Sequence, residues 1–246
     1  SKEEAQEYAW TTSWGVSTRL IGAVIMTHSD DDGLVLPPRI APSHVVLLPI
    51  IRKDEDRPMV MDYTRRLAEA LTGRRYGDLH ITVEVDDRET GAKGWEWIKK
   101  GIPLRVEIGP RDIAKDSVFV GRRDKRPKDK VSIPRDTFVE TVGSILDEIQ
   151  NNLYQRAVTL REANEKEIDV RDDFDTFFTP KNSRQPEIHG GFVFAHWCGS
   201  GDCEEKVKED LKVTIRCIPF SQGDEVGKCI VCGQESPKRV VFAKAY

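Results

Sequence analysis

The segment TTSWGVSTRLIGAVIMTHSDDDGLVLPPRIAP, residues 11–42, indicates more about this chain than any other part of its sequence. It begins with a short β-type run, turns at Gly15 and continues into an apolar helix that Arg19 opens. Free N–H groups and about half a positive charge at a helix N-terminus suit a phosphate or a carboxylate. The guanidinium of Arg19 can pair with phosphate or stack on an aromatic base. The segment therefore predicts one wall of a nucleotide-type pocket.

A turn and a double proline follow this helix. Residues 29–32, SDDD, can turn because Ser and Asp side chains support turns by hydrogen bonding to nearby backbone. X-Pro steps favour an extended chain and stop helices. Residues 37–42, PPRIAP, therefore mark a natural domain boundary.

Composition limits the classes of protein to which the chain can belong. Its 246 residues suffice for about two domains of ordinary size, and 38% of them are hydrophobic and 33% charged. No apolar run approaches the roughly 20 residues of a membrane span, and the first residues lack the order of a signal peptide. We expect a cytoplasmic chain with no membrane partner. A net charge of −4 argues against broad, non-specific binding to nucleic acid, although a local basic patch can still bind RNA.

Strand and helix patterns alternate after the boundary. The order βαβαββ indicates an α/β fold, a mixed sheet with helices on its faces. The expected strands are His44–Ile51, Leu79–Val85, Pro103–Ile108 and Ser117–Gly121, and the expected helices are Asp56–Leu71 and the segment 91–101.

One long amphipathic helix is expected from Thr137 to about Glu165. Its apolar stripe predicts an ordinary docking surface, and the charge run Arg161–Arg171 predicts a solvated helix end or linker. The stripe consists of Phe138, Val142, Ile145, Ile149, Leu153, Ala157 and Leu160.

Four cysteines form two close pairs, Cys198-x4-Cys203 and Cys229-x2-Cys232, with 25 residues between the pairs. Two such pairs suit tetrahedral Zn²⁺, whose ligands come from two tight turns. Because four thiolates leave no open position, we expect a structural zinc ion. Free buried thiols are the alternative.

Two further residues of this block have side chains that can bind a metal. His196 stands two residues before Cys198 and is a possible substitute ligand. Cys217 lies in the strand-like run VTIRCIPF, so we expect a small, buried apolar side chain there.

As a continuous string, residues 11–42 resemble the third signature motif of class II aminoacyl-tRNA synthetases, in the version found in prolyl-tRNA synthetases. The one departure in the segment is Ser29, where that family usually has Gly. The resemblance implies a fragment of an antiparallel class II catalytic domain.

This resemblance also implies roles for five residues. Ser13, Trp14 and Gly15 would form part of the wall of the proline pocket, while Ser17 and Arg19 would contact ATP, Arg19 being the catalytic residue. Outside that resemblance, Trp14 could be a core residue and Arg19 could merely begin a helix.

The strand and helix block resembles the anticodon-binding domain shared by the synthetases for histidine, glycine, threonine and proline. The matching residues are Asp86-Asp87-Arg88, Lys93 with Trp97, Lys100 to Pro103, and Arg105 through Asp112. The resemblance implies contacts to the second and third anticodon bases, both G, from Arg105, Arg111 and Lys130 or Lys128. The alternative for any one of these charges is a solvated surface.

Two departures from that domain bear on the guanine contacts. The loop between Arg88 and Lys93 is shorter than usual, and Ile98 stands where an acidic residue is expected after Trp97. Glu96 could replace that acidic residue only if the local register shifts.

The last block resembles the C-terminal zinc domain of the archaeal and eukaryotic type of prolyl-tRNA synthetase. The matching stretches are FAHWCGSGDC, RCIPF, the CxxC pair and the closing RVVFAKAY. In that family the tail can approach the catalytic domain, and Tyr246 is the residue at that position here.

Together the resemblances imply four parts. These are a catalytic-domain piece (1–42), the anticodon-binding domain (43–135), a connecting long helix (136–172) and a small α+β zinc-binding domain (173–246). They imply a ligase that joins L-proline to tRNA(Pro) through prolyl-adenylate, with ATP, Mg²⁺ and structural Zn²⁺, as a homodimer when intact. Two further class II motifs are expected upstream, so the chain alone is expected to be inactive. The alternative is a non-catalytic tRNA- or RNA-binding module derived from a synthetase.

Overall fold

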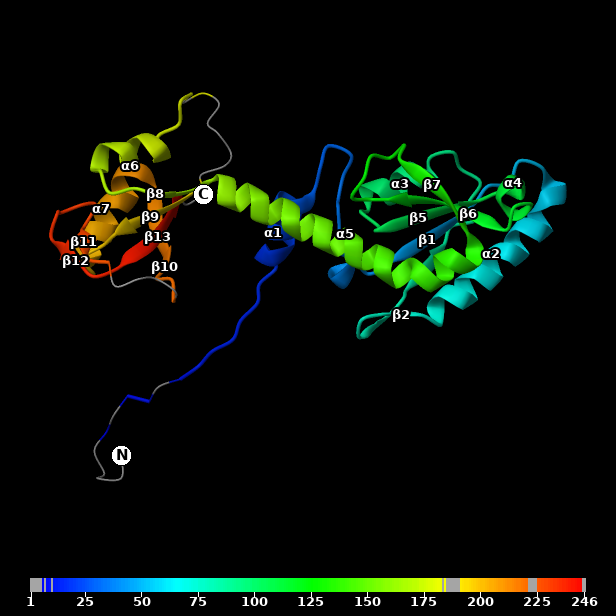
Figure 1. Cartoon of the computed structure of the whole chain (residues 1–246), viewed down its shortest axis with the longest axis horizontal. Coiled ribbons are helices and arrows are strands. Elements are labelled where there is room, and N and C mark those ends of the chain that lie inside the picture. The colour runs from blue at the N-terminus through cyan, green and yellow to red at the C-terminus, as the bar shows by residue number, and fades with distance from the viewer. Residues whose placement is uncertain are drawn as a thin grey trace. The chain divides into compact units, whose positions relative to one another are not determined.

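Figure 1 shows the computed structural model, which describes residues 6, 8–9, 11–182, 184, 191–220 and 225–244. The chain divides into two compact units, Ser1–Gln155 and Arg156–Tyr246. Tyr246 itself, for which the resemblance implies a role near a catalytic domain, lies outside the described residues. Across the described ranges, no helix is both long enough and apolar enough to cross a membrane.

The first unit opens with an exposed, irregular segment and a helix. Helix α1, Arg19–His28, begins at the expected arginine and has no buried residue. The expected β-type run at Thr11 is wrong, since residues 11–17 are exposed and form no strand. A strand requires a hydrogen-bonding neighbour, and no described strand pairs with this run. A short 3₁₀ turn, η1 at Pro38–Ile40, occupies the expected boundary.

A mixed five-stranded sheet forms the centre of the first unit, in the order β4-β1-β5-β6-β7. Strand β1 runs parallel to both β4 and β5, whereas β6 and β7 are antiparallel to their neighbours. The prediction of a mixed α/β sheet is therefore confirmed. Its strands are β4 (Val83–Val85), β1 (Val45–Pro49), β5 (Leu104–Ile108), β6 (Ser117–Arg122) and β7 (Lys130–Pro134).

The helices of this unit cover the sheet on two faces. Alternate residues of β1 and β5 pack with α2 (Arg57–Thr72) and α5 (Arg135–Ala163) in the larger core. The other face of β1 packs against Trp97 of α3, Lys93–Lys99. Because neighbouring residues of a strand face opposite ways, Arg105 of β5 lies on the α3 side.

Two expected elements differ in detail. The predicted strand Leu79–Val85 is two short strands, because β3 (Leu79–His80) turns back on β2 (Arg75–Tyr76) before β4 joins the main sheet. The long helix α5 buries Phe138 to Leu153 but leaves Leu160 exposed, so its apolar stripe docks over only part of its length. The remaining short elements are the 3₁₀ turn η2 (Asp54–Asp56) and helix α4 (Pro110–Ile113).

The second unit contains a four-stranded sheet in the order β10-β13-β9-β8, with two helices. Phe174, Phe178 and Phe242 meet edge to face in its core. A two-stranded hairpin, β11 and β12, lies beside this sheet in the same unit. The elements are β8 (Glu165–Glu167), α6 (Arg171–Phe178), β9 (Phe192–His196), α7 (Gly201–Leu211), β10 (Val213–Cys217), β11 (Gly227–Lys228), β12 (Glu235–Ser236) and β13 (Arg239–Lys244).

Candidate functional site

The side chains for which the sequence predicts proline and ATP contacts lie at the start of the first unit. Ser13, Trp14, Gly15, Ser17 and Arg19 are all exposed, and Trp14 retains 93% of its accessible surface. Arg19 stands at the first position of α1, as predicted. The described residues bring no other functional side chain against them.

Arg105, in the first unit, is a buried arginine. Its side chain is only 3% exposed, and its two terminal nitrogens have no hydrogen-bond partner among the described residues. Burial lowers the pKa of this guanidinium, and the nearby charge of Arg123 lowers it further. A buried cation without acceptors is costly, so this position is suited to a ligand that supplies them.

Gly121 makes room for Arg105. The two residues face each other across β5 and β6, and an added Cβ at Gly121 would lie 3.1 Å from Nη2 of Arg105. Lys130 pairs with Gly121 from the other side. Sequence reasoning did not identify Gly121, because its importance depends on the pairing of three strands.

The other two predicted anticodon residues are placed differently. Lys130 donates to Glu107, with Nζ and Oε1 2.5 Å apart, so its charge is already paired. Arg111 is exposed in α4, beyond the far end of β5 from Arg105. Lys128, the alternative to Lys130, is exposed in the turn before β7. The strands thus bring Arg105 and Lys130 together and leave Arg111 apart.

A charged network around Asp86 contacts side chains of α3. The Asp86 carboxylate accepts from Arg88 at 2.8 and 2.9 Å and from Nε1 of Trp97 at 2.7 Å. These hydrogen bonds, that of Arg88 foremost, lower the pKa of the buried Asp86 carboxyl far below its usual range. Arg88 also pairs with Glu96.

The network explains the departure at Ile98. Glu96 points to Arg88 without a change of register, while Ile98 is 5% exposed and joins the core. An acidic side chain at position 98 would be buried, which is costly for a charge without a partner. The carboxylate that contacts Trp97 comes instead from Asp86.

A cavity of about 400 Å³ opens beside this network at the carboxyl ends of β1 and β4. Lys93 projects to it and donates to the backbone oxygens of Pro49 and Asp86. Burial lowers the pKa of Lys93. In open α/β sheets, ligands bind outside the carboxyl ends of the strands where the strand order reverses. This cavity lies at the carboxyl edge of the sheet, beyond β1 and β4, whereas the strand order reverses between β1 and β5.

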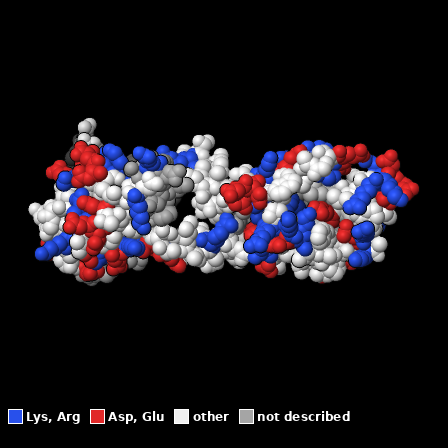
Figure 2. Space-filling view, turned by 90° about the horizontal axis from the view of Figure 1, so that it is seen from above, with Lys and Arg blue, Asp and Glu red and all other residues white. Residues whose placement is uncertain are grey.

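Basic and acidic side chains are interspersed over both units on the face drawn in Figure 2. No broad face of one sign is visible there. Binding of an anionic polymer through this face would therefore depend on particular side chains.

The four predicted metal ligands meet in the second unit. Cys198 follows β9, Cys203 lies in the first turn of α7, and Cys229 and Cys232 flank the turn between β11 and β12. Their sulfur atoms all lie within 4.8 Å of one another. The Cys198 sulfur is 3.7 Å from that of Cys203 and 3.6 Å from that of Cys232. Tetrahedral Zn–S bonds of about 2.3 Å require sulfurs about 3.8 Å apart, so the cluster can hold one metal ion.

The backbone around the cluster favours thiolate at one position. Burial alone would raise the pKa of Cys229, but backbone N–H groups of Cys232, Val231 and Cys198 lower it to about 7. Burial raises the pKa of Cys203. Because a metal binds the thiolate form, these N–H groups favour the metal-binding form of Cys229.

His196 and Cys217 do not join the cluster. His196 is 1% exposed, and neither ring nitrogen has a hydrogen-bond partner in the described part of the chain. The expectation that Cys217 is buried is wrong, since its side chain is exposed. It is the last residue of β10, and it pairs with Val241 of β13 after a shift of register that follows Ile215.

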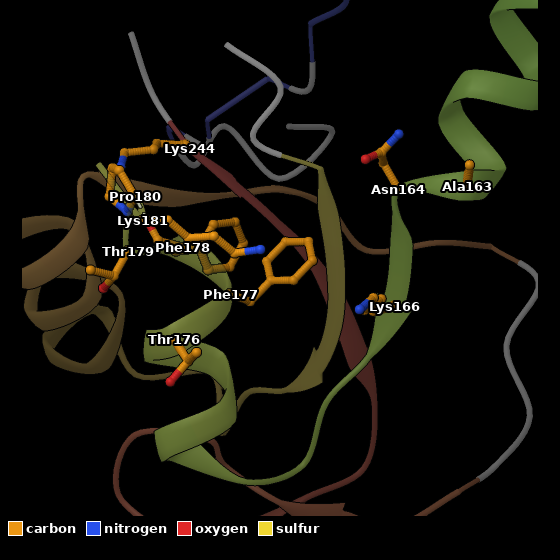
Figure 3. A pocket seen from close by; sticks show the side chains of 10 residues that line it. All are labelled: Ala163, Asn164, Lys166, Thr176, Phe177, Phe178, Thr179, Pro180, Lys181 and Lys244. Atoms are coloured by element: carbon orange, nitrogen blue, oxygen red, sulfur yellow. Dashed lines mark hydrogen bonds between the residues drawn. The ribbon is translucent and has the colours of Figure 1, made fainter. Parts of the chain in front are cut away.

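A separate cavity of about 430 Å³ lies in the second unit (Figure 3). Lys166, Lys181 and Lys244 contribute the charges of its lining, and Phe177 lies beneath the Lys166 ammonium, 5.7 Å from its ring centre. Nζ of Lys244 donates to the Phe178 carbonyl at 3.0 Å. None of the site residues predicted from the sequence lines this cavity.

Comparisons with known proteins agree with both units. Residues 44–145 match the family described as "Anticodon binding domain", and residues 185–246 match "Prolyl-tRNA synthetase, C-terminal". Proline--tRNA ligase 2 of Anaeromyxobacter dehalogenans is 52% identical over 245 residues, covering 97% of this chain and 48% of that protein. The proline--tRNA ligase of Protochlamydia amoebophila is 49% identical over 243 residues, covering 98% of this chain and 48% of that protein.

A solved structure shares the fold. The crystal structure of prolyl-tRNA synthetase from Cryptosporidium parvum, complexed with L-proline and AMP, has a TM-score of 0.74 and 31% sequence identity, over 93% of this chain and 46% of that one. The chain spans about half the length of the curated relatives that it matches. The chain is thus similar to the C-terminal portion of prolyl-tRNA synthetases, in which an anticodon-binding domain precedes the C-terminal domain of that family.

Proposed function

We propose that this chain is part of a proline–tRNA ligase, in which it supplies the third class II motif, anticodon recognition and a structural zinc domain. The proposal is supported by the order of the matched regions and by relatives that carry the name proline--tRNA ligase. The same resemblance supports the four-part division 1–42, 43–135, 136–172 and 173–246, and a homodimer for the intact enzyme.

In the proposed reaction, the proline carboxylate attacks the α-phosphorus of ATP and pyrophosphate leaves. A terminal ribose hydroxyl of tRNA(Pro) then attacks the carbonyl carbon of prolyl-adenylate, and AMP leaves. Arg19 stabilises negative charge on the phosphates, and Ser17 contacts ATP. Ser13, Trp14 and Gly15 supply an aromatic face and close backbone approach for the proline ring. Mg²⁺, when bound with ATP, neutralises charge on the triphosphate.

The observation that carries the anticodon role is the buried guanidinium of Arg105, whose two terminal nitrogens have no hydrogen-bond partner within the described ranges. Guanine presents O6 and N7 as a pair of acceptors that matches two guanidinium N–H donors. An anticodon loop can splay such a base into a protein pocket. Lys130, which pairs with Gly121, and Arg111, in helix α4, are the further proposed contacts.

The four cysteines would hold one Zn²⁺ as a structural ion. Thiolate sulfur is the donor that zinc prefers in closed four-coordinate sites. The separations between the sulfurs support this metal, as described above.

The experiment measures binding of tRNA(Pro) by the synthetase that contains this chain, in a titration at fixed salt. The wild-type protein is expected to prefer tRNA(Pro) over a variant whose second and third anticodon bases are not G. Arg105→Lys should weaken binding of tRNA(Pro) by about tenfold or more, since a bidentate guanine contact contributes about 1–3 kcal/mol.

The matched control is Arg65→Lys, at an exposed arginine of α2 that pairs with Asp62. This variant should bind like the wild type. Equal affinity of the wild-type protein for both tRNAs would contradict the proposed recognition. A folded protein that contains no zinc by metal analysis would contradict the metal assignment.

A further inference from the structure

Arg123 joins three segments of the first unit that are distant in sequence. Its side chain is 2% exposed, although it follows directly on strand β6. Nη1 and Nη2 donate to both carboxylate oxygens of Asp30, at 2.7 and 2.5 Å. Nη2 also donates to Gly33 O at 3.2 Å, and Nε donates to Ile98 O at 3.1 Å. One guanidinium thus connects the loop after α1 with the last turn of α3.

Backbone hydrogen bonds strengthen the same connection. Leu34 N donates to Lys99 O at 3.0 Å, and Leu36 N donates to Gly101 O at 3.2 Å. Gly33 approaches so closely that an added Cβ would lie 2.6 Å from the Cα of Lys99. Residues 33–36 and 99–101 are therefore in close backbone contact, so that a shift of one segment moves the other.

One end of this connection is the proposed anticodon site. Ile98 and Lys99 directly follow Trp97, which is hydrogen-bonded to Asp86. Arg123 also acts electrostatically on Arg105, and its charge contributes to the lowered pKa of that guanidinium. A ligand that reaches Arg105 or Trp97 changes the surroundings of Arg123.

The other end is the segment with the third class II motif. Asp30 stands two residues after the last residue of α1. It is fixed at both ends of its loop, because Asp30 N and Gly33 N each donate to the carbonyl of the other residue at 3.1 Å. The carboxylate also accepts from Asp32 N at 3.0 Å. A displacement at Arg123 is therefore passed to the C-terminal end of the helix that Arg19 begins.

We propose that the Arg123–Asp30 ion pair transmits occupancy of the anticodon site to helix α1, so that both are positioning residues for the chemical step. This inference rests on the proposed function. Neither side chain touches a substrate. The pair acts by holding α3 and α1 in one register, so the correct anticodon raises the rate of aminoacylation as well as the affinity for tRNA.

The test uses Asp30→Asn in the synthetase that contains this chain. This substitution keeps the shape of a side chain that is 44% exposed, and it removes only its charge. The measurements are kcat and KM of aminoacylation, with tRNA(Pro) and with a tRNA changed at the second anticodon base. A third measurement is proline-dependent exchange of pyrophosphate into ATP without tRNA.

In the wild-type enzyme, we expect the changed anticodon to lower kcat about fivefold or more, the usual size of coupling between two sites. In Asp30→Asn the ratio of the kcat values for the two tRNAs should fall toward one, while the ratio of their KM values remains as in the wild type. Exchange without tRNA should stay within about twofold of wild type, because that assay involves no anticodon. Arg123→Lys, which cannot form the paired contact, should behave in the same way.

The control is Asp136→Asn, which removes an exposed carboxylate 2.9 Å from Arg135, away from this connection. It should keep the wild-type difference in kcat. Three results would overturn the proposal: an unchanged kcat difference in Asp30→Asn, an equal loss in the assay without tRNA, or a wild-type enzyme that discriminates in KM alone. Failure of the proposed function would look different, since the wild-type enzyme would then form no prolyl-tRNA or would ignore the anticodon.

Discussion

Each of the two units of this chain is stabilised internally by a different kind of interaction. The first has a continuous apolar core between its sheet and helices α2 and α5, and several of its charged side chains are paired, such as Asp86 with Arg88. The second has a smaller core, and four sulfurs lie where its hairpin meets α7. The hairpin strands β11 and β12 pair through only two residues each. We infer that the first unit folds on its own contacts, whereas the hairpin of the second depends on a metal.

The largest expected effect tests this difference directly. Removing the metal with a chelator, or substituting Cys229→Ser, should destabilise the second unit by about 4 kcal/mol, the order expected for loss of a structural cross-link or metal. Hydrogen exchange is the measurement. The Cys229 and Ile230 amides, bonded to Gln234 O and His196 O, should exchange rapidly, and the Leu104 amide of the first unit should not.

Cys217→Ser is the matched control for that experiment. Cys217 is exposed and outside the cluster, so its loss should change stability by less than about 0.5 kcal/mol. If chelation leaves the Cys229 and Ile230 amides protected, the contrast between the two units does not hold.

The next effect concerns the paired ions of the first unit. Asp86→Ala leaves Nε1 of Trp97 without its acceptor and removes one of the carboxylates that pair with Arg88, so the first unit should lose about 3 kcal/mol. Urea unfolding monitored by exchange of the Leu104 amide measures it. Asp87→Ala, at an exposed carboxylate 3.9 Å from Arg57, should cost less than about 0.5 kcal/mol. Equal losses in both variants would mean that burial of the pair contributes nothing.

Acid should act on the first unit through the same carboxylates. The pKa values of Asp86 and Asp30 are lowered in the folded chain, chiefly by hydrogen bonds from Arg88 and Arg123. The unfolded chain therefore binds protons more readily, and the stability that these groups contribute is complete above about pH 5 and lost as the pH falls below about 4. Urea titrations between pH 3 and 7 test this. A wild-type protein equally stable at both limits would contradict it, and Asp86→Asn should show a shallower fall.

The smallest expected effect concerns the space that Gly121 leaves for the Arg105 guanidinium. Gly121→Ala places a methyl group 3.1 Å from Nη2 of Arg105 and 3.4 Å from Cγ of Lys130, so the guanidinium must shift by tenths of an ångström. Binding of tRNA(Pro) should weaken about threefold, which corresponds to roughly 0.7 kcal/mol. Gly73→Ala, whose added Cβ meets backbone oxygens at an ordinary 3.6 Å, should leave binding unchanged. An unchanged affinity in Gly121→Ala would contradict this expectation, because the Arg105 guanidinium would then tolerate the added methyl group.

Several features could be predicted because they depend on residues close together in the chain. The start of α1 at Arg19, the alternation of strands and helices, and the grouping of the cysteines into pairs all follow from local patterns. Where a pattern needed a distant partner, the prediction was less successful. Residues 11–17 form no strand, and Cys217 is exposed at the end of β10, after the shift of register.

The sequence by itself determined the class of fold, the family resemblance and the residue types available at each proposed site. Only the tertiary structure decided which charges meet. Strand register places Gly121 between Arg105 and Lys130, Lys130 binds Glu107, and Arg123 pairs with Asp30 across 93 residues of chain. The physical reason is that a side chain's partner depends on pairing between strands and on burial, which arise from contacts between segments remote in the chain.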